Sequence, residues 1–397
     1  MSRISRAIGW GFNRFGKFFG NIPSFFIRAF MPLNKGSVVC WAYSFKQYSC
    51  NPRYITEYLL KNHPEYRIYW IFRGNNIPSD LDSRIKAVKY HSWEYYKVMN
   101  TAEFLMTNAR TDPWRIYWHK RRGQKYIMTW HGGVALKQVE ADAESKLSYN
   151  YVKKAKIDSK ICDLMLSGAE CQTKLLSEKF WYSGEILEKG TPRCDILFDS
   201  KRHEAISRHV RNTYGIEDGS KIVLYAPTFR SNRSIEPYRI DWKATVKALK
   251  EMFGGADVKV LLRLHPNLIG KVDISTLLNS PEVTDVTLYH DMQELMCISD
   301  MLITDYSSSM FDFMILDRPC LLYAADIKEY DRGYYYDFTD LPFPLAQTQN
   351  ELIENIRHFD ADSYKSKVKA FNTEKVGLLE NGNACSALAE WMKSHSK

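Results

Sequence analysis

The strongest constraint on the fold is a regular alternation of short apolar runs with amphipathic stretches, which begins after residue 36. The apolar runs predict strands at 37–42, 67–72, 84–89, 103–107, 125–130 and 163–167, and a second set at 221–226, 258–264, 286–290, 300–304 and 319–323. Amphipathic stretches predict helices between them, at 51–62, 92–101, 241–253, 291–299 and 308–317. Strands that alternate with helices indicate βαβ units and parallel sheets.

A polar stretch at 199–220 separates the two sets of strands and is the best domain boundary. We expect an N-terminal segment at 1–33, a first αβ domain at 34–205 and a second at 206–397. The two domains would face each other across a central cleft, where ligands bind at the carboxyl ends of the strands. The helices expected at 349–360 and 384–395 are candidates to pack back across both halves.

The composition is that of a globular protein, with 45% hydrophobic and 25% charged residues. The eight cysteines are scattered and include no Cys-x-x-Cys pair. This pattern predicts reduced thiols and no zinc site, and we expect no cofactor.

The net charge of +9 is concentrated near the N-terminus, where eight basic residues precede the first acidic one, Glu57. Residues 1–30 interleave these cations with aromatic side chains, and the longest uncharged run, 18–27, is too short to cross a membrane. The pattern favours an amphipathic helix on an anionic membrane surface. A helix packed on the protein's own body is the alternative. Nucleic acid is disfavoured as a partner, because the rest of the chain is nearly neutral.

The first candidate motif follows the strand expected to end at Trp130, where His131, Gly132 and Gly133 come next. Glycines at such a turn let the backbone approach a ligand and leave its amides free. A neutral imidazole at the end of a strand can accept a hydroxyl proton. The alternative is a histidine that only stabilises a tight turn.

The second motif, Arg263-Leu264-His265-Pro266, closes another apolar strand. Strand alternation would put Arg263 and His265 on the same side, and two such donors suit a phosphate group. A salt-bridged arginine beside a capping histidine is the structural alternative.

The third motif is a strand that ends at Thr304 and Asp305, then a hydroxyl-rich turn with Ser307 and Ser308, then a helix. Serine hydroxyls and free amides at a helix start can bind phosphate, although Asp305 or Ser307 could equally be an N-cap. Asp312 stands between two phenylalanines in that helix, so it needs a partner, either an arginine or a ligand hydroxyl.

Two further turns present arginines. One is Gly190-Thr191-Pro192-Arg193, and the other contains Pro227, Thr228 and Arg230 and is followed by Arg233 and Arg239. Arginine-rich loops are usually solvated surface, but beside a phosphate site they could hold an anionic acceptor.

Taken together, these segments resemble the CDP-glycerol glycerophosphotransferase family of teichoic acid polymerases and primases, over roughly residues 36–390. The matching segments are Trp130-His131-Gly132 with Leu136-Lys137, Gly190 to Asp195, Tyr225 to Thr228, Arg263 to Pro266, Ile303 to Ser308, and Phe311-Asp312. Several motifs in the right order are far more specific than any one alone.

The resemblance implies a GT-B fold, with two Rossmann-like domains of which the first is the acceptor side and the second holds the nucleotide. It also implies monotopic, peripheral attachment to the cytoplasmic face of the cell membrane. By the same resemblance, His131 is the candidate general base and His265 a second catalytic residue. The implied substrate-binding residues are Trp130, Gly132, Gly133, Lys137, Arg193, Pro227, Thr228, Arg230, Arg263, Thr304, Asp305, Ser307, Ser308 and Asp312.

One segment departs from the family pattern. The family often has Trp-His-Gly-Thr-Pro-Leu-Lys, whereas here Gly133, Val134 and Ala135 precede Leu136 and Lys137, which is one residue more. The lysine is kept but shifted by one, so contacts through 133–135 do not carry over.

The expected reaction is attack by a hydroxyl of a lipid-linked acceptor on the distal phosphorus of CDP-glycerol or a related CDP-polyol, with release of CMP. His131 would take the hydroxyl proton, while Arg263 and His265 would offset phosphate charge. The product would be teichoic acid or a phosphate-containing capsule. Two alternatives remain at this stage: a GT-B glycosyltransferase that uses a nucleotide sugar, and a non-enzymatic module that binds an anionic membrane surface.

Overall fold

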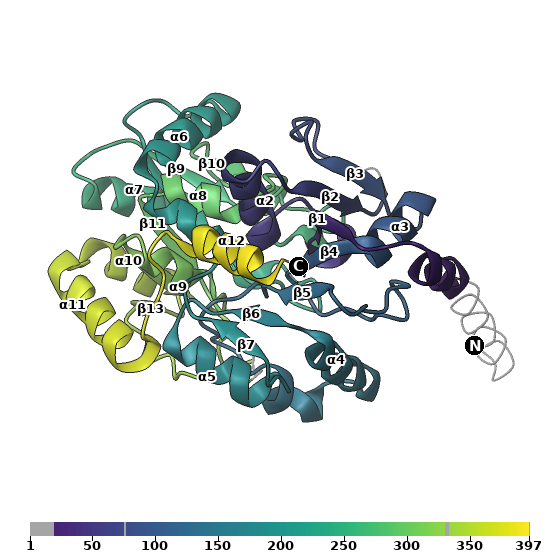
Figure 1. The fold of residues 1–397 in the computed structure, drawn as a ribbon. Helices are drawn as coiled ribbons and strands as arrows, with labels where there is room; N and C mark the ends of the chain where they lie inside the picture. Colours follow the sequence, from purple (N-terminus) through teal and green to yellow (C-terminus); the bar gives the residue numbers. More distant parts are fainter. Residues whose placement is uncertain (1–19, 75–76, 330–332, 397) are drawn as a thin grey trace, which may run out of the picture.

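Two parallel sheets frame the molecule in a computed structural model that describes residues 20–74, 77–329 and 333–396 (Figure 1). The first sheet has seven strands in the order β3-β2-β1-β4-β5-β6-β7. They are β1 Asn34–Trp41, β2 Arg67–Phe72, β3 Lys86–Lys89, β4 Ala102–Thr107, β5 Lys125–Met128, β6 Leu164–Leu166 and β7 Glu185–Leu187. The strand order changes direction between β1 and β4, and such a switch point is where open parallel sheets bind ligands.

The second sheet has six strands in the order β10-β9-β8-β11-β12-β13, and its switch point lies between β8 and β11. They are β8 Lys221–Tyr225, β9 Val258–Leu262, β10 Val283–Asp285, β11 Met301–Thr304, β12 Cys320–Tyr323 and β13 Leu345–Ala346. The α/β class with two parallel sheets, which the sequence predicts, is therefore confirmed.

Helices cover the faces of both sheets (Figure 1). They are α2 Cys50–Asn62, α3 Trp93–Thr101, α4 Tyr149–Ile161, α5 Glu170–Lys179, α6 Ser200–Tyr214, α7 Trp242–Met252, α8 Met292–Ile298, α9 Ser309–Met314, α10 Gln349–Arg357, α11 Ala361–Phe371 and α12 Ala384–His395. Central strands such as β4 and β11 are buried along their whole length, as parallel strands between two helical layers must be. All eight cysteines are free thiols.

Several strand limits differ from the sequence prediction. The strand expected at 286–290 is β10 at Val283–Asp285, three residues earlier. The strands expected at 125–130 and 258–264 end at Met128 and Leu262, so both histidine motifs lie in loops beyond their strands. Strand alternation therefore does not fix the relative orientation of Arg263 and His265.

The last helix, α12, crosses back and packs on α2 of the first half (Figure 1). Its first amides, those of Ala384 and Cys385, donate to the Asp195 carboxylate at 2.9 Å and 2.7 Å. By contrast, α10 packs on α7 within the second half. Of the two helices expected at 349–360 and 384–395 to pack across both halves, α12 does so, whereas α10 packs within the second half.

A buried ion network also joins the halves, between α2 and α8. Arg53 bonds to Asp291 at 3.0 Å and to Glu294 at 2.7 Å. The hydroxyl of Tyr54 donates to Asp291 at 3.0 Å. These contacts fix how the two sheets face each other.

Residues 20–30 form a helix at the edge of the molecule, drawn in dark purple in Figure 1. Residues 1–19 of the segment expected to associate with a membrane lie outside the described residues. In the described part, Ser24 and Ile27 are buried against the body, whereas Phe25, Phe26 and Phe30 are exposed. No helix within the described ranges is long and apolar enough to span a membrane.

Candidate active site

His131 stands in a tight turn after β5. The preceding residue, Trp130, has a left-handed backbone (φ 53°), which is costly for a bulky side chain and typical of a functional site. The Nδ1–H of His131 donates to the carbonyl oxygen of Asn108 at 2.9 Å. Because a carbonyl can only accept, Nδ1 carries the proton, and Nε2 of the neutral ring keeps a free lone pair.

The ring of His131 is exposed to solvent, yet many protein atoms surround it. This partial desolvation lowers the pKa of His131 below its ordinary value. The Asn108 carbonyl opposes the shift, and the positive charge of Arg193 adds to it. The ring is therefore neutral at neutral pH, which is the form that a general base needs.

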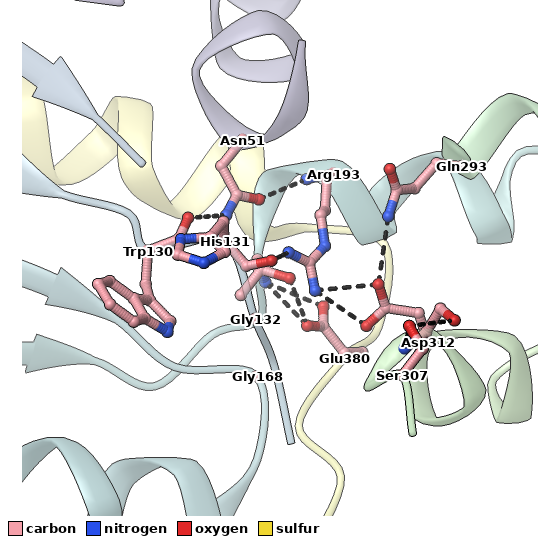
Figure 2. Close-up of polar contacts among 12 residues, drawn as sticks. Asn51, Trp130, His131, Gly132, Gly168, Arg193, Gln293, Ser307, Asp312 and Glu380 are labelled. Carbon is pink, nitrogen blue, oxygen red and sulfur yellow. Dashed lines mark hydrogen bonds and ion pairs between the residues drawn. The ribbon is translucent and has the colours of Figure 1, made fainter. Parts of the chain in front are cut away.

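Arg193 holds the His131 turn against the second half (Figure 2). Its Nη1 donates to the His131 carbonyl, and its Nη2 donates to Asp312 at 3.0 Å. Gln293 of α8 donates to the other oxygen of Asp312 at 3.2 Å. The partner that Asp312 requires is therefore an arginine. Both terminal nitrogens of Arg193 are bound to protein groups, whereas its Nε is buried without a hydrogen-bond partner. Its expected role as a substrate ligand stays a prediction.

Asn51, at the start of α2, fixes the same turn from the other side (Figure 2). Its side-chain nitrogen donates to the carbonyls of Thr129 and Trp130 at 3.2 Å and 3.0 Å, and its side-chain oxygen accepts the Arg193 amide at 2.9 Å. The sequence analysis missed this buried residue, because a single asparagine at a helix start carries no distinctive signal.

The residues that follow His131 make protein contacts. The Gly132 carbonyl accepts from Gln172 at 3.0 Å. Gly133 lies beside the Arg193–Asp312 pair, and a Cβ added there would make only ordinary contacts, the nearest at 3.5 Å from the Asp312 carboxylate. Lys137 pairs through its backbone with Tyr334 of the second half.

Arg263 lies one residue after β9 and has an unusual environment for a cation. Its Nη2 donates to the Tyr289 carbonyl at 3.1 Å, and its Nε is buried without a hydrogen-bond partner. No carboxylate of the described residues lies within ion-pair distance of its guanidinium. Desolvation lowers the pKa of Arg263, but an arginine keeps its proton. The charge of Asp291 lies within electrostatic range but forms no ion pair with Arg263. A desolvated cation without an ion-pair partner is suited to an anionic ligand.

His265 has the tautomer opposite to that of His131. Its Nδ1 accepts the Asn267 amide proton at 3.1 Å, so in the neutral ring Nε2 carries the hydrogen. Desolvation, and then the charge of Arg263, lower the pKa of His265. Its ring is therefore a neutral hydrogen-bond donor, whereas that of His131 is an acceptor.

Arg230 and Asp305 form a scaffold within the second half. Arg230 is buried and bonds to Asp326 at 2.6 Å and to Asp305 at 2.9 Å. Asp305 accepts the backbone amides of Thr228 and Tyr306 at 2.8 Å and 2.6 Å. Arg230 is therefore buried and paired with carboxylates, whereas its sequence context allowed a solvated loop. It fixes the loops after β8 and β11.

The hydroxyl-bearing residues near β11 divide into two kinds. Thr304 is buried and donates to the Ala226 carbonyl at 2.7 Å, which links β11 to the loop of buried Pro227. Ser307 and Ser308 are half-buried and precede α9. That helix has six residues, not the ten expected at 308–317, although it begins within one residue of the expected start. Thr228 has a buried hydroxyl without a hydrogen-bond partner.

Tyr43, which the sequence analysis also missed, connects the two histidine motifs. Its ring packs edge-to-face on the His131 ring, with 5.8 Å between centroids. Its phenol also lies within electrostatic range of Arg193 and Arg263. Groups from the carboxyl ends of both sheets therefore meet at this residue.

A large cavity of about 1000 Å³ lies elsewhere, beside the helix over residues 20–30. It is mostly apolar, and Ile22, Phe25, Phe26, Trp114 and Ile157 are among its lining residues. His119 and Asp112 also line it, but none of the motif residues does. We therefore assign the active site to the histidine motifs and not to the large cavity.

Comparisons with known proteins place these observations in a family. The family model of CDP-Glycerol:Poly(glycerophosphate) glycerophosphotransferase matches residues 24–392. The teichoic acid poly(glycerol phosphate) polymerase of Bacillus subtilis strain 168 is 32% identical over 91% of this chain and 49% of the relative. The enzyme of the same description from Bacillus spizizenii is 30% identical over 92% of this chain and 94% of the relative.

Solved structures agree with this assignment. A histidine-to-asparagine variant of the wall teichoic acid polymerase TagF, soaked with CDPG, superposes with a TM-score of 0.81 and 29% identity, over 96% of this chain and 97% of that chain. The chain spans about half the length of the first curated relatives that it matches and over nine-tenths of others. The family resemblance seen in the sequence is thus confirmed.

Proposed function

Because this chain belongs to the CDP-glycerol:poly(glycerophosphate) glycerophosphotransferase family, we propose that it transfers glycerol phosphate from CDP-glycerol to a hydroxyl of a lipid-linked acceptor or growing polymer in teichoic acid synthesis. The names of its relatives support this substrate pair. The observation that carries the proposal is the presence of a neutral acceptor imidazole, His131, on the first half and of a cation without an ion-pair partner, Arg263, beside a neutral donor imidazole, His265, on the second.

In the proposed reaction, Nε2 of His131 takes the proton of the acceptor hydroxyl. The acceptor oxygen forms a new bond to the glycerol-bearing phosphorus, and the bond from that phosphorus to the bridging oxygen breaks. The bridging oxygen leaves with CMP, which carries away the electron pair. A base positioned in this way typically contributes about 10²–10⁴ in rate.

On the donor side, Arg263 and Nε2–H of His265 are placed to offset the charge of the pyrophosphate. The half-buried hydroxyls of Ser307 and Ser308 and the orphaned hydroxyl of Thr228 are further ligands in this proposal. Arg193 and Asp312 act through His131, because their ion pair holds the turn in place. Fixed donors of this kind act on charge that develops in the transition state.

We also propose that the protein attaches to the cytoplasmic face of the cell membrane. The support is the helix over residues 20–30, which exposes Phe25, Phe26 and Phe30 beside a basic segment of the sequence. Apolar side chains flanked by cations are the pattern of a helix that lies in an anionic membrane surface. The partner in this proposal is therefore a membrane and not a nucleic acid.

The test is incubation with CDP-glycerol or CDP-ribitol and a lipid-linked acceptor, with CMP release and product length measured from pH 5 to pH 9. We expect CMP release with CDP-glycerol and a loss of about 10²–10⁴-fold in His131→Gln. The rate of the wild type should fall as the pH drops through the lowered pKa of His131, because the base must be unprotonated.

His63→Gln is the matched control, since His63 pairs with Glu65 at the surface, away from the motifs. It should keep the wild-type rate. Near-normal turnover in His131→Gln would contradict the assignment of the base, and release of UDP or GDP from nucleotide sugars would contradict the donor.

A further inference from the structure

The loop after β1 contains an unusual run of strained backbone. Tyr43, Ser44 and Phe45 have φ values of 44°, 59° and 72°, and none of them is a glycine. Left-handed conformations of such residues cost about 1–3 kcal/mol each and persist where the surrounding structure imposes them, most often at functional sites. This loop lies at the carboxyl end of β1, beside the switch point of the first sheet.

Asn108 links this loop to the candidate base. It follows β4, the other strand of the switch point, and it is fully buried. Its side-chain oxygen accepts the Tyr43 amide at 2.9 Å, and its backbone carbonyl accepts Nδ1–H of His131 at 2.9 Å. Its Nδ2 is buried without a hydrogen-bond partner, which costs free energy. One residue therefore sets the positions of both Tyr43 and His131.

The Tyr43 side chain lies beside the candidate base. Its ring contacts the His131 ring, and the side chain keeps partial exposure to solvent. Its neighbours include the Cys50 thiol, which is a weak hydrogen-bond partner, and the cations Arg193 and Arg263. Burial raises the pKa of the Tyr43 phenol well above its ordinary value, so the hydroxyl keeps its proton and can donate.

The charges around the phenol differ between its two arginine neighbours. Asp312 compensates Arg193 at 2.9 Å, whereas Arg263 has no such partner among the described residues. A negative group bound at Arg263 would therefore lie within electrostatic range of the Tyr43 phenol, whose ring packs on His131. The phosphoryl group in transfer is the group that must meet both a base and a cation.

We propose that Tyr43 is a further catalytic residue, whose hydroxyl donates a hydrogen bond to a non-bridging oxygen of the phosphoryl group being transferred, and that Asn108 positions it together with His131. The inference rests on the proposed function. It assigns to the first half a phosphate contact in addition to the base, whereas the other proposed phosphate ligands lie on the second half.

The test is the Tyr43→Phe variant, which removes the hydroxyl and keeps the ring contact with His131. We expect kcat for CMP release from CDP-glycerol to fall by about 10²-fold, as for the loss of one oxyanion donor. KM for CDP-glycerol should stay close to the wild-type value, because the bond strengthens in the transition state. The melting temperature should not change.

Tyr48→Phe is the matched control on the same loop, since the Tyr48 ring packs on Trp70 at 4.6 Å. It should keep the wild-type kcat. Wild-type kcat in Tyr43→Phe, or an equal loss in Tyr48→Phe, would overturn the assignment of Tyr43 while leaving the proposed function intact. No CMP release by the wild type itself would overturn both.

Discussion

Glu380 is a buried carboxyl group whose environment favours its protonated form. It lies in the segment before α12, where it accepts the Thr191 hydroxyl at 2.7 Å (Figure 2). A Cβ on Gly168 would stand 2.0 Å from its oxygen, so that glycine makes room for it. Burial raises the pKa of Glu380 to about 7, and Asp312 adds to the shift while the bonds from Thr191 and the charge of Arg193 oppose it.

This shift predicts a specific dependence of stability on pH. Between pH 4.5 and pH 7 the folded protein holds a proton on Glu380 that the unfolded chain has lost. The free energy of unfolding therefore decreases as the pH rises through this window, by up to about 3 kcal/mol. Urea unfolding at pH 5 to pH 8 should show Glu380→Gln gaining stability relative to the wild type as the pH rises. Glu390→Gln, on exposed surface of α12, should show no such trend, and a constant difference for Glu380→Gln would contradict the prediction.

The sequence predicts the role of a residue when that role depends on its neighbours along the chain. It does not predict the role when a partner far away in the sequence determines it. His131, Arg263 and His265 were recognisable because each follows an apolar strand. The role of Arg230 was not, since the carboxylate of Asp326 stands 96 residues away and turns an apparently free cation into a scaffold. Tyr43, Asn51 and Asn108 belong to no motif, and only tertiary contacts show their positions.

At the scale of elements, the ion network between α2 and α8 should be a main source of stability across the two halves. Removing Arg53 would leave Asp291 and Glu294 as buried carboxylates without a counter-charge. Breaking such a network typically costs about 3–5 kcal/mol. We therefore expect Arg53→Ala to lower the free energy of unfolding by that amount in a urea titration.

The control for this prediction is Lys86→Ala, which breaks the exposed pair of Lys86 with Glu94 on the first half. Exposed pairs contribute roughly 0–1 kcal/mol, because water and salt screen them. If both variants lost a similar free energy of unfolding, the network between the halves would not be a main source of stability.

The predicted elements were correct wherever an apolar run was long enough to show its period. The central strands β1, β2, β4, β8 and β11 all fall on predicted runs. The edge strands β7 and β13 have three and two residues and were missed, since so short a run shows no periodicity. The helix expected at 308–317 is shorter because local propensity does not set where tertiary packing ends a helix.

At the scale of the whole molecule, one end carries an apolar surface that is left exposed among residues 20–74, 77–329 and 333–396. Phe25, Phe26 and Phe30 are 60%, 52% and 78% exposed, and Trp114 beside them is 55% exposed. The same helix is anchored to the body, because the Ser24 hydroxyl donates to the Tyr117 carbonyl and Asn21 bonds to His119 at 3.1 Å. The sequence left open whether this helix packs on the protein's own body or lies on a membrane surface. In the structure it packs on the body and still exposes an apolar face.

This surface predicts binding to anionic vesicles. Each phenylalanine moved from water into the apolar layer contributes about 1.5–3 kcal/mol, so replacing Phe25 and Phe26 together by serine should weaken the affinity for phosphatidylglycerol vesicles by at least about 10²-fold in a sedimentation assay. Leu288→Ser, at a 77% exposed position on the second half, is the control for a general loss of surface hydrophobicity and should bind like the wild type. Unchanged binding by the double variant, or an equal loss in the control, would contradict a membrane role for this helix. Arg28 and Lys153 flank the same apolar surface, so part of the vesicle affinity should depend on salt. At 0.5 M salt the screening length is roughly 4 Å. We expect this salt to weaken vesicle binding of the wild type only in part, because burial of the aromatic rings is not screened.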